Sequence, residues 1–147
     1  MHIEQQIKID TTPEKIFSIY KDVKGWSRWD IGLDYSSIDG EFKKGAKGEI
    51  KPKKAPNPIE FIIEEVEENK HFTTFSDSIL CSFKYDFTLE SREDNQTVAK
   101  HQIWIEVKKP YRYIFPIAFI FANKFIGKSM ENDLPKALKN LKLLAER

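Results

Sequence analysis

The chain has 147 residues and a formal net charge of +1, from 24 Lys and Arg against 23 Asp and Glu; this near-neutral balance disfavours a general nucleic-acid binder, which is usually strongly basic. Its length fits one domain over residues 1–147 better than two, and its single cysteine excludes an internal disulfide and a thiolate metal cluster. Aromatic residues make up 13% of the sequence, which suits a large apolar core or an apolar cavity.

The chain begins with a predicted strand, residues 3–9, in which apolar and polar side chains alternate imperfectly. A helix start follows, with Thr12 as the N-cap and Pro13 in the first turn. A capping box of Thr11 and Glu14 is the alternative start. Apolar residues then recur at helical spacing, which predicts one or two short helices after the first strand.

The middle of the chain has the pattern of antiparallel strands. Turn residues separate six segments of strand character, which are 33–39, 47–53, 59–67, 71–76, 79–90 and 97–107. From Cys81 to Leu89 the residues alternate strictly between apolar and polar. This alternation predicts a strand with one apolar face and one face in water.

Beyond Pro110 the apolar residues again recur at three or four positions, as in a long helix. Pro135 interrupts this pattern, so we expect a kink or a local break there. The order of elements predicts an α+β domain, in which a curved antiparallel sheet of about seven strands wraps around the long C-terminal helix.

The start of that helix, residues 113–126, is apolar nearly all round, although a buried helix needs only one apolar stripe. Three interpretations stay open beside a plain core helix, which is the commonest outcome: these residues line a cavity mouth, form a homodimer interface, or contact lipid. The stretch is too short for the roughly 20 residues of a membrane-spanning helix. Residues 1–6 also lack the pattern of a signal peptide, so we expect a cytoplasmic protein without a transmembrane segment.

Five short motifs follow one another along the chain: Thr-Pro-Glu-Lys-Ile-Phe at 12–17, residues 23–30 ending in Trp-Asp, Gly-Glu-Phe-Lys-Lys-Gly at 40–45, Asn-Gln-Thr-Val at 95–98, and residues 138–146. Together, over essentially the whole chain, they resemble the START-like (SRPBCC) superfamily and, within it, the polyketide cyclase/dehydrase and lipid-transport branch. This resemblance implies a helix-grip fold with a deep cavity between the sheet and the terminal helix, usually for an apolar or amphipathic ligand.

The resemblance also implies a cavity lining of mostly aromatic and aliphatic residues: Trp29, Phe61, Ile63, Phe72, Phe83, Tyr85, Phe87, His101, Ile103, Asn123 and Met130. In this lining Tyr85, His101 and Asn123 would orient a polar group of the ligand. The assignment depends on strand parity, because a one-residue bulge would bring Ile62 or Phe75 inward in place of their neighbours.

Tyr85 and His101 are the best polar pair for chemistry. If segments 79–90 and 97–107 form a hairpin about Asp94, the two residues lie roughly opposite one another on the inner face. They would then bind a ligand carbonyl or hydroxyl, or transfer a proton in an aldol-type cyclisation. The alternative is a hydrogen-bonded core histidine beside a tyrosine whose hydroxyl reaches solvent.

Other catalytic and metal chemistry has little support. His2, His71 and His101 are far apart in the sequence and follow no metal-binding spacing, so we expect no metal. No glycine motif for a dinucleotide or a phosphate is present, so we expect no cofactor. Cys81 lies on the predicted inner face, where a free thiol usually behaves as a small hydrophobic group.

We therefore expect a carrier or sensor that binds a small hydrophobic or amphipathic ligand and does not bind nucleic acid. The first alternative is a cofactor-free cyclase or dehydratase that uses Tyr85 and His101. The second is a protein-interaction or co-chaperone-like domain whose cavity is filled by its own side chains. The enzyme ranks below the carrier because the sequence has no motif for a nucleophile, a metal or a cofactor.

Overall fold

A computed structural model describes the backbone of residues 1–78, 81–109 and 116–147, and the side chains of these residues except 116–126. Its elements, in chain order, are β1 (His2–Ile9), α1 (Pro13–Lys21), the short 3₁₀ helix η1 (Val23–Arg28), β2 (Leu33–Ile38), β3 (Lys47–Pro52), β4 (Ile59–Glu67), β5 (His71–Asp77), β6 (Cys81–Arg92), β7 (Gln96–Val107) and α3 (Pro116–Ala145). This order confirms the predicted α+β class and the short helices after the first strand.

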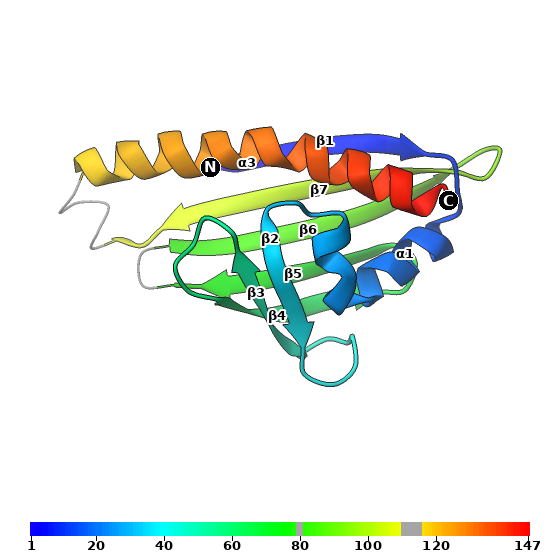
Figure 1. The fold of residues 1–147 in the computed structure, drawn as a ribbon, viewed down its shortest axis with the longest axis horizontal. Helices are drawn as coiled ribbons and strands as arrows, with labels where there is room; N and C mark the ends of the chain where they lie inside the picture. The colour runs from blue at the N-terminus through cyan, green and yellow to red at the C-terminus, as the bar shows by residue number, and fades with distance from the viewer. Residues whose placement is uncertain (79–80, 110–115) are drawn as a thin grey trace.

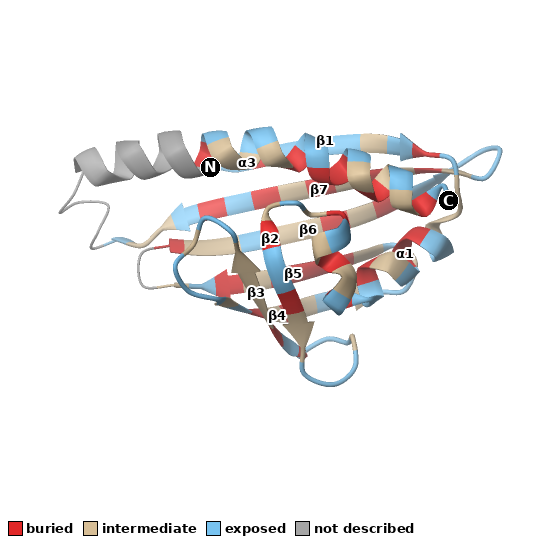
Figure 2. Cartoon of the chain, viewed as in Figure 1, coloured by how far each residue is buried: buried red, intermediate tan, exposed pale blue. Residues whose placement is uncertain are grey.

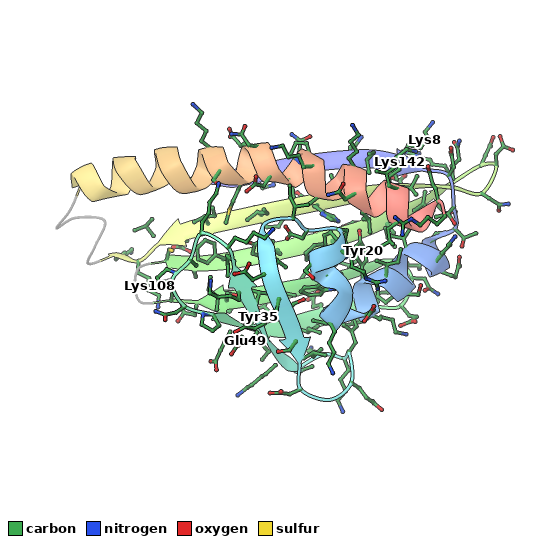
Figure 3. The ribbon with its side chains drawn as sticks, viewed as in Figure 1. Lys8, Tyr20, Tyr35, Glu49, Lys108 and Lys142 are labelled. Carbon is green, nitrogen blue, oxygen red and sulfur yellow. The ribbon has the colours of Figure 1, made fainter. Side chains whose placement is uncertain are left out.

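The strands form one antiparallel sheet in the order β1-β7-β6-β5-β4-β3-β2. Helix α3 runs along the β1 side of this curved sheet (Figure 1). Helices α1 and η1 lie over the sheet farther from β1, with α1 toward the end where the C-terminus lies (Figure 1). At the β1 edge, Lys142 Nζ of α3 donates a hydrogen bond to the Lys8 carbonyl at 3.0 Å (Figure 3). The arrangement is the predicted helix-grip fold.

Two predictions about the helices, the start of the first and the interruption of the last at Pro135, can be compared with the structure. Thr12 is the N-cap of α1 and Pro13 occupies its first position, although the Thr12 side chain makes no capping hydrogen bond. Helix α3 continues through Pro135, so the expected local break is wrong. Pro135 removes one backbone donor, but Leu134 and Leu138 on either side of it are buried. We attribute the intact helix to this packing, because tertiary contacts supply most of a helix's stability.

Alternation along the strands produces the core. Along β7, buried positions alternate with half-buried or exposed ones, and on β6 the buried positions are Cys81, Phe87 and Leu89 (Figure 2). The buried residues form two clusters on the inner face of the sheet. One, rich in aromatic rings, lies where α1 and η1 cover the sheet; the other includes Ile103 and Ile105 of β7 and Leu134 of α3. These two clusters divide the interior that the sequence predicted as one cavity.

Candidate functional site

The hairpin of β6 and β7 carries the predicted polar pair. Its turn is centred near Asp94, which has a positive φ of 60°. In the register across the hairpin, Tyr85 pairs with Ile103 and Phe87 pairs with His101. Residues two apart share a face of a strand, so Tyr85 and His101 lie on the same inner face. They are not directly opposite one another, because His101 pairs with Phe87, two residues beyond Tyr85.

His101 has a different hydrogen-bond partner. Its Nε2 lies 2.8 Å from the hydroxyl of Tyr20, which α1 contributes from the other side of the interior (Figure 3). Burial lowers the pKa of His101 to about 3 and raises the pKa of Tyr20 above its ordinary value. At neutral pH the imidazole is therefore uncharged, and so low a pKa makes it a weak general base. The geometry matches a hydrogen-bonded core histidine.

Sequence reasoning did not find Tyr20 as this partner. Its helical spacing after Pro13 indicates only that it lies on the buried face of the first helix. A buried tyrosine usually needs a hydrogen-bond partner for its hydroxyl, and that requirement was the available signal. Sequence alone does not show which distant strand supplies the partner.

An aromatic cluster fills the part of the interior nearest α1. Phe72 and Phe87 stack with ring centroids 4.3 Å apart, and Trp26 stacks on Phe61 at 5.5 Å. Five of the predicted lining residues belong to this cluster and are nearly inaccessible: Trp29, Phe61, Ile63, Phe72 and Phe87. These side chains pack against one another, so this part of the predicted cavity is occupied by the protein itself.

The other end of the inner face is less completely covered. We call four residues there the half-buried lining: Phe83, Tyr85, Val107 and Met130. They pack around a smaller buried cluster that contains Ile103 and Leu134. Phe83 and Tyr85 share the inner face of β6 with the buried Phe87, yet they remain partly accessible to solvent. The predicted lining residues Phe83, Tyr85, Ile103 and Met130 therefore come together here.

The remaining predicted lining residues lie elsewhere or have side chains that the structure does not describe. The side chains of residues 113–126, among them Asn123, lie outside the part of the chain that the structure describes, and so does the homodimer interface predicted for this stretch. The alternative lining residues Ile62 and Phe75 pair with each other across β4 and β5. Alternation places them on the face opposite Ile63.

A polar rim lies beside the half-buried lining, where α3 meets the loop before β2. Asp30 Oδ1 accepts a hydrogen bond from the Gly32 backbone N–H at 3.1 Å. A β-carbon built on Gly32 would lie 3.3 Å from Asp30 Oδ1 and 3.9 Å from Asp133 Oδ2, so the two carboxylates approach each other across this glycine. On α3, Ser129 Oγ lies 3.5 Å from Asp133 Oδ2 and accepts a hydrogen bond from Lys54 at 2.9 Å.

The charges of this rim act on one another. Burial raises the pKa of Asp30 above its ordinary value; the Gly32 hydrogen bond lowers it, the Asp133 charge raises it, and Lys53 lowers it. Burial also raises the pKa of the Tyr85 phenol, and the negative charge of Asp30 raises it further. Tyr85 packs in the cluster that contains Met130 and Leu134 of α3, and Asp133 of the same helix approaches Asp30 across Gly32, so Asp30 and Tyr85 both border this end of the inner face. Together they offer a hydrogen-bond acceptor and a hydroxyl beside apolar rings.

The described residues contain neither a metal-binding cluster nor a membrane-spanning helix. Within residues 1–78, 81–109 and 116–147, no three His, Cys, Asp or Glu side chains are grouped so that they can hold a metal ion. Among the helices described in these same ranges, none is both long enough and apolar enough to cross a membrane.

Comparisons with known proteins extend over nearly the whole chain. A family model described as polyketide cyclase / dehydrase and lipid transport matches residues 1–146. No curated protein matches the sequence.

Solved structures share the fold at low sequence identity. A START superfamily protein from Mycobacterium smegmatis has a TM-score of 0.70 at 15% identity, with 97% of this chain and 98% of that one covered. The Aha1 dimer from Colwellia psychrerythraea gives 0.69 at 18%, covering 99% and 96%. The di-domain ARO/CYC StfQ of the steffimycin biosynthetic pathway gives 0.77 at 9%, covering 99% of this chain and 50% of StfQ. At these identities the similarity shows the fold alone.

Proposed function

This chain belongs to the polyketide cyclase / dehydrase and lipid transport family, and from that membership we propose that it binds a small hydrophobic or amphipathic molecule against the half-buried lining. Family and fold support a hydrophobic ligand-binding domain of the START and polyketide cyclase type. The proposal assigns the ligand to the Phe83–Tyr85 end of the inner face and assigns a carrier or sensor role to the domain.

The observation that carries this proposal is the uneven burial of the inner face of β6. Phe87 and Leu89 are buried, whereas Phe83 and Tyr85 on the same face remain partly accessible. Met130 approaches from α3 and is likewise only half-buried. Aromatic and aliphatic side chains that face inward without being fully covered favour an apolar ligand, because contact would remove more of their surface from water.

The aromatic cluster restricts the site. Tyr20, Trp29 and Phe72 are almost completely buried, and His101 is already bonded to Tyr20. A ligand that reached this part of the interior would have to displace packed rings, which is costly in a close-packed core. We therefore place the ligand beside the cluster and expect a small molecule, not one that extends the length of the sheet.

Binding of a neutral fluorescent probe, N-phenylnaphthylamine, tests the proposal when combined with two matched substitutions. Phe83→Asp puts a carboxylate into the half-buried lining and is expected to abolish probe binding, because burying an unpaired charge is very unfavourable. Phe75→Asp makes the same change on the neighbouring strand β5, on the opposite face of the sheet, and is expected to leave binding intact.

Circular dichroism and thermal unfolding must first show that both variants fold. Met130→Asp places the same charge on the helix side of the lining and should also abolish binding. If the two lining variants bind the probe as well as Phe75→Asp does, the ligand site is elsewhere. Native mass spectrometry with organic extraction of the wild-type protein then identifies any molecule that copurifies.

The aromatic cluster also supports a second candidate, an interaction domain whose interior is filled by its own side chains. Trp26, Phe61, Phe72 and Phe87 already occupy much of the space between α1 and the sheet. This candidate predicts that a broad panel of apolar probes fails to bind. The probe experiment therefore separates the two functions directly.

A further inference from the structure

We infer that the ligand's polar end is a hydrogen-bond-donating group that carries no negative charge, a hydroxyl or an ammonium, held by Asp30 and Tyr85. This inference rests on the proposed function, since it places the polar end of the same ligand. It divides amphipathic molecules into two classes: alcohols and amines are accepted, and carboxylates are rejected.

Asp30 is positioned to receive such a donor. Its Oδ1 is occupied by the Gly32 N–H at 3.1 Å, and this bond fixes the carboxylate beside the loop that leads into β2. A carboxylate has two oxygens with about four acceptor sites. Within the described residues Asp30 forms no salt bridge, so acceptor capacity remains on a partly buried group.

Helix α3 brings the half-buried lining to this carboxylate. Asp133 and Leu134 lie three and four residues after Met130, so each of them neighbours Met130 on the surface of the helix. Leu134 and Met130 pack in the cluster that also contacts Tyr85, and Asp133 Oδ2 approaches Asp30 across Gly32. The apolar lining and the two carboxylates are therefore adjacent.

Two basic groups, Lys53 and Lys54, also lie near this rim. Lys53 and Lys54 are exposed, and Lys54 is engaged with Ser129 on α3. Asp133 acts on Asp30 more strongly than Lys53 does, so a ligand carboxylate placed beside Asp30 and Asp133 would face two negative charges. Like charges at short range are strongly unfavourable where water is partly excluded. A hydroxyl or ammonium donates to Asp30 instead, and a hydroxyl also accepts from the Tyr85 phenol.

Isothermal titration of the full chain with n-octanol, octylamine and octanoate tests this inference, because the three share one alkyl chain and differ in head group. We expect the alcohol, the amine or both to bind about tenfold or more tightly than octanoate, the preference expected from a single hydrogen bond to a charged acceptor. The ratio between the alcohol and the amine then identifies which donor the site prefers.

Asp30→Asn is the decisive variant, because its amide oxygen can still accept the Gly32 bond while the negative charge is removed. This substitution should reduce severalfold the ratio of the affinity for n-octanol or octylamine to the affinity for octanoate. Asp34→Asn is the matched control: Asp34 is exposed on β2, with Oδ2 3.6 Å from Lys51, and its substitution should leave all three affinities unchanged. Tyr85→Phe keeps the ring and should weaken n-octanol severalfold while leaving N-phenylnaphthylamine bound.

The outcomes separate this inference from the proposed function. If octanoate binds as tightly as n-octanol and octylamine, or if Asp30→Asn leaves the preference unchanged, the head-group assignment is wrong although the site stands. If none of the three amphiphiles and no apolar probe binds the folded wild-type protein, the proposed function fails and this inference fails with it.

Discussion

Acidification should destabilise this protein through one buried histidine. Burial lowers the pKa of His101 from 6.5 to about 3 in the folded chain. In the unfolded chain the imidazole regains its ordinary pKa, so between these two values the unfolded state binds one more proton than the folded state. The free energy of unfolding therefore falls as the pH falls below 6.5, by about 1.4 kcal/mol per pH unit, and this contribution is fully present above that pH.

Urea unfolding between neutral pH and about pH 5 measures this slope. The reference variant is His101→Phe combined with Tyr20→Phe, which removes the titrating group and its partner together and leaves no buried hydroxyl unpaired. We expect the wild type to lose about 1 kcal/mol more than this double variant over the first pH unit below 6.5, because the unfolded imidazole is only partly protonated there and the full slope is reached at lower pH. His2→Gln changes a histidine on the exposed surface and should keep the wild-type slope. Equal slopes in the wild type and the double variant would refute a buried neutral His101.

Three further predictions concern packing and charge. Gly48→Ala should lower the free energy of unfolding by about 1–3 kcal/mol in chemical denaturation, because the new β-carbon would lie 2.5 Å from the Ser37 carbonyl oxygen. Leu138→Ala should cost about 2–5 kcal/mol in the same assay, since Leu138 is 1% exposed, whereas Leu143→Ala, at 57% exposure, should cost little. Asp30→Asn should raise the unfolding temperature at neutral pH, because burial raises the pKa of Asp30 and disfavours its charged form; that advantage should disappear in acid, where both states are protonated.

Local patterns predicted most of the architecture. Strict alternation from Cys81 to Leu89 placed one strand and its inner face. Of the two predicted helix starts, the one with Thr12 as N-cap and Pro13 as first residue is the one observed in α1. Their signals are short-range, because side chains alternate along any strand and proline is favoured at the first helical position. The local break expected at Pro135 is absent for the complementary reason: the packing that keeps α3 continuous involves residues far away in the chain.

The candidate site was only partly predictable. The sequence predicted that Phe83, Tyr85, His101 and Met130 face the interior, but it treated the interior as one cavity. Which inward residues are buried by other side chains depends on what α1, η1 and α3 place over each strand. The sequence did not identify Asp30 as a site residue. Its place in the site depends on its neighbours Tyr85 and Asp133, which are distant in the sequence and are brought near it only by the fold.

Periodicity, turn chemistry and motif order by themselves determined the class of fold and the faces of its strands, since these depend on neighbours within a few residues. The tertiary structure decided how the interior is divided. It paired His101 with Tyr20, packed the aromatic cluster beneath α1, and left Phe83 and Tyr85 half-buried beside Asp30. Such contacts join residues many positions apart, so their partners are set by how the helices pack on the sheet and not by any local pattern.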